Sequence, residues 1–214
     1  MRYDCEMTTD SENDTYATVI LGRLAKSPHL LLPVFFAWMR GWGYRIKYFL
    51  TWQNFSAGKL FRVYGPMNIT GPGQVRFGDN VLIISNAIKP VCIRTLTRVA
   101  KVVLGNNTGL NGTSIQCAVG VSIDDWSNIA DAYITDTPAH TLDRNRRSQT
   151  IEDVQNMPVS IGKNVWVSVN TVILHGVHIG DNSVIGACTL VRKDIPSDVF
   201  AAGNPLRIIK KIDQ

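Results

Sequence analysis

The chain of 214 residues lacks three features that would each indicate a different class of protein. Its four cysteines show no CxxC or paired spacing, which favours free thiols in a reducing compartment over a disulfide framework. Within the apolar segment 16–52, the longest stretch without Lys or Arg, residues 27–39, has 13 residues and includes Pro33, whereas a membrane-spanning helix needs roughly 20 residues. No zinc-finger, RRM or helix-turn-helix pattern is present, so we expect no nucleic-acid partner.

Acidic residues are also missing from one long segment, between Thr15 and Gly78, although eight Lys and Arg residues fall there. The net charge of the whole chain is +5. This asymmetry indicates contact with a polyanion or with an anionic membrane surface. Residues 1–14 are acidic, the opposite of a signal-peptide start. We therefore expect a flexible acidic tail on a cytoplasmic protein, with the inner face of the membrane as a candidate site of association.

A six-residue period from Ile161 to Pro196 is the most specific pattern in the chain. A helix would need apolar residues three and four apart, and an ordinary strand would need strict alternation. The period instead predicts a parallel β-helix, in which each hexapeptide is one short strand and one turn. Gly, Asn and Asp take the turn dihedrals at low cost, and the aliphatic first position points inward. These first positions are Ile161, Val167, Ile173, Ile179, Ile185 and Val191.

The six-residue period also sets the expected domain boundaries. It recurs over residues 104–139, with one extra residue at Ser122, and is irregular over residues 60–103. We predict an all-β domain, a parallel β-helix over residues 60–196 with three hexapeptides in each triangular turn. Residues 140–160 leave the repeat as a polar excursion loop, a feature that is usually functional or disordered. Residues 197–214 form a short C-terminal extension.

Residues 15–59 are predicted to form a basic, apolar helical segment ahead of the β-helix. Two interpretations of this segment stay open. It covers the open end of the β-helix, whose edge must be protected, or residues 15–52 lie on a membrane surface with Arg and Lys side chains reaching the headgroups. Both can hold at once.

Five passages of the chain match the motifs of a known family: Leu104–Gly112, Ile134–Asp143, Val159–Trp166, Val184–Pro196 and Ala202–Pro205. They resemble the hexapeptide-repeat O-acetyltransferases, close to the maltose/galactoside and the O-antigen or capsule polysaccharide acetyltransferases. The resemblance implies a left-handed coil and a homotrimer with active sites between neighbouring subunits. It also implies acetyl-CoA as co-substrate, no metal, and a sugar or lipid-linked glycan as acceptor.

His140 is the candidate general base for acetyl transfer, since it lies where the repeat breaks and histidine is the side chain most often used to move protons in catalysis. The resemblance implies that Asn111 orients the acceptor hydroxyl and that the Trp166 ring stacks on a sugar. It further implies that the backbone N–H of Val169 stabilises the oxyanion, although relatives usually carry a small residue there. No Cys or Ser lies in a nucleophile motif, which favours direct transfer over a covalent intermediate.

The resemblance also implies a set of residues that contact coenzyme A. Ser168, Val169 and Ala187 match positions along the inter-subunit groove. Arg192, Lys193 and Arg207 suit the phosphates, as do Lys210 and Lys211, although a solvated basic tail is the better explanation of the last three.

Three questions remain open on the sequence alone. Asp136 or Asp143 could orient the His140 imidazole, in the manner of a catalytic dyad. His175 and His178 with His140 would supply the three ligands of a catalytic zinc, as in the γ-class carbonic anhydrases, but their spacing does not match that family. A non-catalytic β-helix scaffold is the third class of function.

Overall fold

The computed structural model describes residue 29, residues 31–86 and residues 88–212. The chain divides into two compact units, residues 1–36 and residues 37–214. The described part of the first unit is His29 and the opening of helix α2 (Leu31–Leu50), where the Phe35 and Phe36 rings meet edge to face. The acidic tail and residues 15–28 of the predicted helical segment lie outside the described residues. All described strands belong to the second unit.

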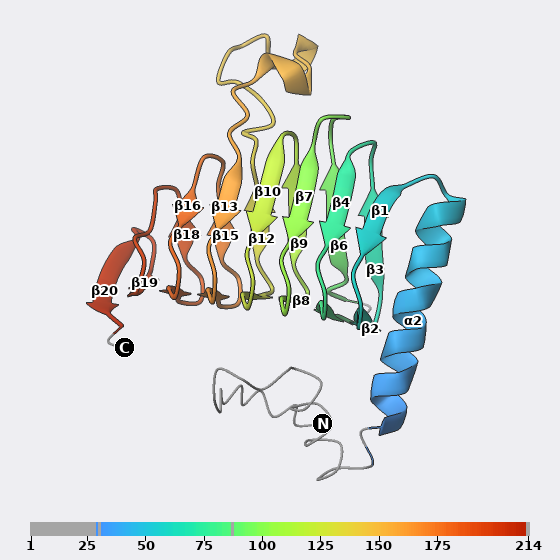
Figure 1. Cartoon of the computed structure of the whole chain (residues 1–214). Coiled ribbons are helices and arrows are strands. Elements are labelled where there is room, and N and C mark those ends of the chain that lie inside the picture. Colours follow the sequence, from blue (N-terminus) through green and yellow to red (C-terminus); the bar gives the residue numbers. More distant parts are fainter. Residues whose placement is uncertain (1–28, 30, 87, 213–214) are drawn as a thin grey trace. The chain divides into compact units, whose positions relative to one another are not determined.

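The second unit is a coil in which each turn contributes one strand to each of three sheets (Figure 1). Sheet A contains β1 (Asn54–Ala57), β4 (Gln74–Phe77), β7 (Lys101–Leu104), β10 (Gly120–Ile123), β13 (Val159–Ile161) and β16 (His178–Ile179). Sheet B contains β2 (Arg62–Tyr64), β5 (Leu82–Ile84), β8 (Gly109–Asn111), β11 (Asn128–Ala130), β14 (Trp166–Val167), β17 (Val184–Ile185), β19 (Val199–Ala202) and β20 (Arg207–Lys211). Sheet C contains β3 (Met67–Thr70), β6 (Val91–Thr95), β9 (Ser114–Cys117), β12 (Tyr133–Thr135), β15 (Val172–Ile173) and β18 (Leu190–Val191).

Strands β1 to β18 make six complete turns, and the predicted left-handed parallel β-helix is confirmed. All six aliphatic first positions between Ile161 and Val191 point into the coil and are at most 1% exposed. Neighbouring turns are stacked in register, so that Ile161 pairs with Ile123 on one side and with Ile179 on the other. Burying one such side chain contributes about 1.5–3 kcal/mol to folding, and the stack repeats this gain at every turn.

Four of the six turns from sheet A to sheet B have asparagine where the backbone is left-handed, and the other two have Leu60 and Trp126. Asn80, Asn107, Asn164 and Asn182 all have φ between 53° and 59°. Their side chains also join successive turns, since the Asn80 amide donates to Asn107 at 2.8 Å and the Asn164 amide donates to Asn182 at 3.1 Å. Asparagine therefore lowers the cost of the turn conformation and ties one turn to the next.

Helix α2 covers the first turn of the coil through residues of the second unit. The Tyr48 hydroxyl accepts a hydrogen bond from the Ile69 N–H at 2.9 Å and donates one to the Met67 carbonyl at 3.1 Å. Burial raises the pKa of Tyr48 to about 12. Gly41 lies so close to the Phe61 carbonyl that a Cβ would collide with it. These contacts agree with the interpretation that the helical segment covers the open end of the β-helix. No helix among the described residues is both long and apolar enough to cross a membrane.

The ends of the coil extend beyond the hexapeptide pattern. The first strand begins at Asn54, six residues before the start expected at residue 60. Gly58 follows it as Gly78 follows β4, but Ala57 stands where β4 has the larger inward residue Phe77. After the last complete turn, β19 pairs parallel to β17 and β20 returns antiparallel to β19. The expected C-terminal extension thus continues sheet B.

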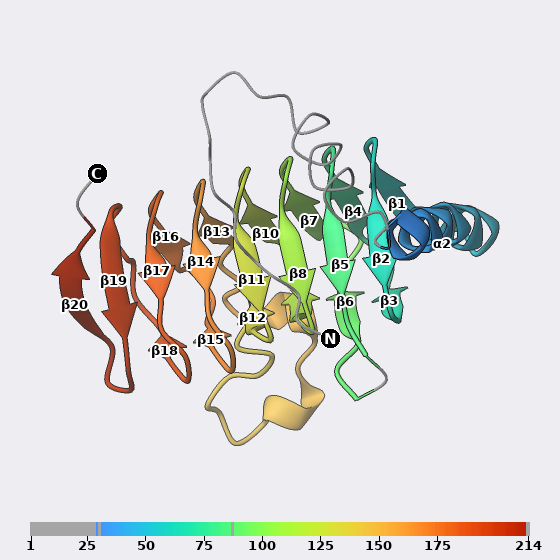
Figure 2. The same cartoon turned by 90° about the horizontal axis from the view of Figure 1, so that it is seen from below.

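Two edges of this triangular coil carry the predicted site residues. The B/C edge, where sheet B passes into sheet C, includes residues 112–113, 168–171 and 186–189. The C/A edge, where sheet C passes into the next strand of sheet A, includes residues 136–158, 174–177 and 192–194. The long loop 136–158 projects from the coil on the side opposite sheet B (Figure 1). Figure 2 shows sheet B face-on.

Candidate active site

His140 lies near the start of the loop on the C/A edge, two residues after Pro138, whose carbonyl accepts the His140 N–H at 2.8 Å. The buried Thr137 hydroxyl stabilises this turn, because it accepts a hydrogen bond from the Ala139 N–H at 2.9 Å. Ala139 has φ 63°, a conformation that costs an L-residue about 1–2 kcal/mol. The His140 residue is exposed, and no described residue hydrogen-bonds to its imidazole. The backbone of the candidate base is therefore positioned while its ring stays accessible.

Asp136 has a structural role in this turn. Its carboxylate is fully buried and accepts the backbone N–H groups of Ala118, Val119 and Gly120 at 2.6–2.7 Å. The Asp143 carboxylate accepts the Thr141 hydroxyl at 3.0 Å. Neither carboxylate is hydrogen-bonded to His140, so the structure does not place either acid as the orienting member of a dyad.

Replacing Asp136 with Asn should lower the free energy of unfolding by about 2–3 kcal/mol, because an amide loses the charge-assisted bonds and turns an N–H group toward buried donors. Urea denaturation at neutral pH would measure this change. Asp124→Asn is the matched control, since Asp124 is exposed, and we expect its effect to stay within about 0.5 kcal/mol. Equal shifts for the two variants would contradict the structural role of Asp136.

Cys117 lies beneath the same turn, with its thiol 3.3 Å from the Asp136 carboxylate. Burial, and then the neighbouring negative charge, raise the pKa of the Cys117 thiol. The thiol therefore stays neutral and donates to Asp136, which is a packing role.

The B/C edge gathers another group of predicted residues. Asn111 ends β8, Ser168 and Val169 follow β14, and Ala187 follows β17. In the turn after β14, the Ser168 N–H donates to Ile185 and the Asn170 N–H donates to Asp131. Among the described residues none accepts a hydrogen bond from the Val169 N–H, which lies between them. This is expected for the second residue of a turn whose third residue, Asn170, has φ 57°.

The next turn along the B/C edge repeats this arrangement at Ala187. The Gly186 N–H donates to Ala201 and the Cys188 N–H donates to Val169, while no described residue accepts the Ala187 N–H. Cys188 has φ 57°, as Asn170 does one turn earlier. Two free N–H donors therefore lie one turn apart, roughly 5 Å, on the same edge.

Trp166 lies on the outer face of sheet B and is 55% exposed. It precedes Ser168 by two residues, and the strand register places it between Asn128 and Val184. The indole therefore lies on the sheet B face, three residues before Val169 in the chain.

Ser168 belongs to a column of small residues whose other members sequence reasoning missed. Each directly follows an inward residue of sheet B and is half-buried: Ala130, Ser168, Gly186 and Ala202. A Cβ on Gly186 would come within 2.8 Å of the Ala202 Cβ, so the column is narrow at that point. The hexapeptide register could have found these positions, because they share one place in the repeat with Asn111.

The predicted phosphate-binding residues divide between the two edges, and all three are exposed. Arg207 pairs with Ala202 and lies beside the B/C edge. Arg192 and Lys193 follow β18 on the C/A edge, two turns from the loop that carries His140. One chain thus has cations near each of its two candidate edges.

One chain does not bring all the predicted residues together. His140 is on the C/A edge, whereas Asn111, Trp166 and Val169 belong to sheet B or the B/C edge. Sheet C lies between these edges, and its strand β12 alone spans three residues, roughly 10 Å. A site that uses both groups needs the C/A edge of one chain beside the B/C edge of another.

The two remaining candidate zinc ligands also lie on or beside the C/A edge. The His178 Nδ1 is 2.8 Å from the Ser160 hydroxyl, and the His175 Nδ1 is buried without a described partner. Within residues 29, 31–86 and 88–212, no three His, Cys, Asp or Glu side chains are grouped so that they could hold a metal ion.

Residues 158–193, which include strands β13 to β18, match the family model for bacterial transferase hexapeptide (six repeats). This segment of the chain is a hexapeptide repeat. Galactoside O-acetyltransferase of Escherichia coli K12 is 52% identical to this chain over 61 residues, which are 28% of this chain and 30% of the relative. The chain spans between 30% and 39% of the length of the curated relatives it matches.

Solved structures show the same fold as this chain. A variant of AntD, an N-acyltransferase from Bacillus cereus solved with dTDP-4-amino-4,6-dideoxyglucose and coenzyme A, has a TM-score of 0.61 and 21% identity over 78% of this chain and 89% of its own. A galactoside acetyltransferase in complex with coenzyme A is 30% identical over 74% of this chain and 66% of its own, with a TM-score of 0.44.

Proposed function

We propose that this protein is an O-acetyltransferase that moves an acetyl group from acetyl-CoA to a hydroxyl of a sugar or of a surface-polysaccharide precursor. The observation that carries the proposal is the 61-residue stretch that is 52% identical to galactoside O-acetyltransferase. The free Val169 and Ala187 N–H donors and the accessible His140 support it, since acyl transfer needs oxyanion donors and a base.

In the proposed reaction, His140 takes the proton of the acceptor hydroxyl as its oxygen attacks the thioester carbonyl. The carbonyl oxygen becomes an oxyanion that accepts the free Val169 N–H. The intermediate then collapses, the carbon–sulfur bond breaks, and the departing thiolate takes the proton from the His140 imidazolium. Asn111 orients the hydroxyl and Trp166 stacks on the sugar ring. No acyl-enzyme forms.

The proposed coenzyme A site follows the column of small residues on sheet B. The pantetheine arm lies along Ser168, Gly186 and Ala187, where the absence of bulky side chains leaves room for it. Arg207 on this edge contacts its phosphates, together with Arg192 and Lys193 from the C/A edge of the neighbouring chain. The residues therefore fit the co-substrate in chemistry and in shape.

The test of this function is release of free thiol from acetyl-CoA, measured with a panel of sugars, nucleotide sugars and lipid-linked glycans. Release that depends on the acceptor supports the transferase and identifies the acceptor class. No release with any acceptor, together with no binding of acetyl-CoA by calorimetry, would overturn the proposal and favour a non-catalytic scaffold.

The homotrimer is part of the proposal, because the two groups of site residues lie on different edges of one chain. Mixing two inactive variants tests it directly. His140→Ala keeps an intact B/C edge, and Val169→Pro keeps an intact His140. Trimers refolded from a 1:1 mixture should recover about a quarter of the wild-type activity, since half of the chains supply each intact edge. No recovery would place each site within one chain.

A further inference from the structure

We propose that the exposed face of α2 and the turn after it dock on a membrane surface rich in anionic lipid. This docking face consists of seven residues that are 39–94% exposed: Trp38, Met39, Trp42, Ile46, Phe49, Leu50 and Trp52. Monomeric soluble proteins rarely expose so many large apolar side chains together, and such patches mark interaction sites.

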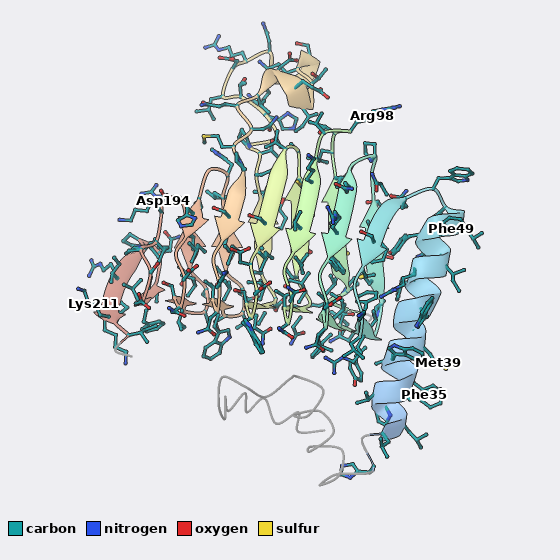
Figure 3. The ribbon with its side chains drawn as sticks, viewed as in Figure 1. Phe35, Met39, Phe49, Arg98, Asp194 and Lys211 are labelled. Carbon is teal, nitrogen blue, oxygen red and sulfur yellow. The ribbon has the colours of Figure 1, made fainter. Side chains whose placement is uncertain are left out.

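The helix has two opposed faces, and only one of them is used by the coil. Ala37, Gly41 and Tyr48 are buried, and they recur at a spacing of four and then seven residues, which is one face of a helix. The docking face takes the opposite side. Met39 and Phe49 point away from the strands in Figure 3, so packing against the β-helix leaves them unpartnered.

Cations border the docking face on both sides. At 100° per residue, Arg40 and Lys47 fall on one flank and Arg45 on the other. Arg40 and Lys47 line an open depression together with Tyr44 and Gly65. Apolar side chains that enter the headgroup region between two cationic borders are the arrangement expected of an interfacial helix.

The charge of this region favours lipid over a second copy of the chain. The sequence has no Asp or Glu between Thr15 and Gly78. If two copies of α2 met face to face, their cationic borders would come together with no carboxylate from this segment to neutralise them. Anionic headgroups neutralise these cations at the membrane surface. Exposed Trp side chains also suit the membrane interface, where an amphipathic ring is partly wet.

Sedimentation of the full chain with phosphatidylcholine vesicles, with and without phosphatidylserine, tests the proposal. No acetyl-CoA is needed, so a negative result here leaves the transferase proposal untouched. We expect binding to vesicles that contain phosphatidylserine, with affinity that falls as salt is added. Ile46→Glu should weaken it at least tenfold, since Ile46 is 55% exposed at the centre of the face.

Two matched control variants distinguish binding through this face from nonspecific binding of the protein to vesicles. Ile88→Glu makes the same change at an isoleucine that is 89% exposed in a loop of the coil, and it should leave binding unchanged. Arg40→Gln should weaken binding about fivefold, whereas Arg98→Gln, at an exposed arginine beyond β6, should not. Wild type that fails to bind at low salt, or equal losses for Ile46→Glu and Ile88→Glu, would overturn the proposal. Self-association that Ile46→Glu abolishes without vesicles would assign the face to a second copy.

Discussion

Replacing His140 with Ala is expected to lower kcat for acetyl transfer by about 10²–10⁴-fold, while the affinity for acetyl-CoA stays unchanged. The imidazole is exposed and no described residue bonds to it, so its removal leaves no buried partner unsatisfied. The loss therefore falls on proton transfer. Free-thiol release in the presence of the acceptor measures kcat, and calorimetry measures binding.

His178→Ala is the matched control for this variant. His178 is exposed beside the same C/A edge, where its ring contacts the Ser160 hydroxyl, and it has no role in the proposed reaction. We expect its kcat to remain near that of wild type. An unchanged rate for His140→Ala would refute the assignment of the base.

Replacing Val169 with Pro is expected to lower kcat by about 10²–10³-fold, since it removes one oxyanion donor. The substitution suits this position for two reasons. No described residue accepts the Val169 N–H, so no hydrogen bond of the fold is lost. Proline is also common at the second position of a turn whose third residue has positive φ, as Asn170 has.

Val169→Ala is the control at the same position, because it shortens the side chain and keeps the N–H. The side chain is 43% exposed, so the truncation should cost little stability. If both variants lose the same activity, the side chain and not the amide is responsible. A fall in the urea midpoint of Val169→Pro alone would attribute its loss to folding instead.

The repeat itself could be predicted from the sequence because the residue types of each hexapeptide indicate which positions are buried and which lie in a turn. Ile161 and Val167 need a dry interior, and Asn164 tolerates a left-handed turn, so three local preferences agree on one strand and one turn. The first strand, Asn54–Ala57, is less clearly marked, because Ala57 stands where β4 has the larger Phe77. Its place in the coil follows from pairing with β4, which is a contact between residues distant in sequence.

The roles of Asp136 and of α2 could not be predicted in this way. In the sequence, Asp136 and Asp143 are both carboxylates close to His140 and cannot be told apart. Only the pairing of β9 with β12 places the N–H groups of residues 118–120 within hydrogen-bond distance of Asp136. For α2, the sequence supports both a cap and a membrane contact. In the structure one face of the helix packs on the coil and the other is exposed, because Tyr48 is buried against the first turn while Phe49 is 81% exposed.

The sequence by itself determined the period and the inward aliphatic stack, since each depends on local chemistry repeated every six positions, and its resemblance to a known family named the candidate residues. Only the tertiary structure decided where those residues lie in space. It places His140 on one edge and Val169 on another, because a coil with three sheets separates positions that are close in sequence and aligns positions one turn apart. Which residues share an edge, a column or a face depends on how the turns of the coil stack, and the hydrogen bonds between neighbouring turns fix that stacking.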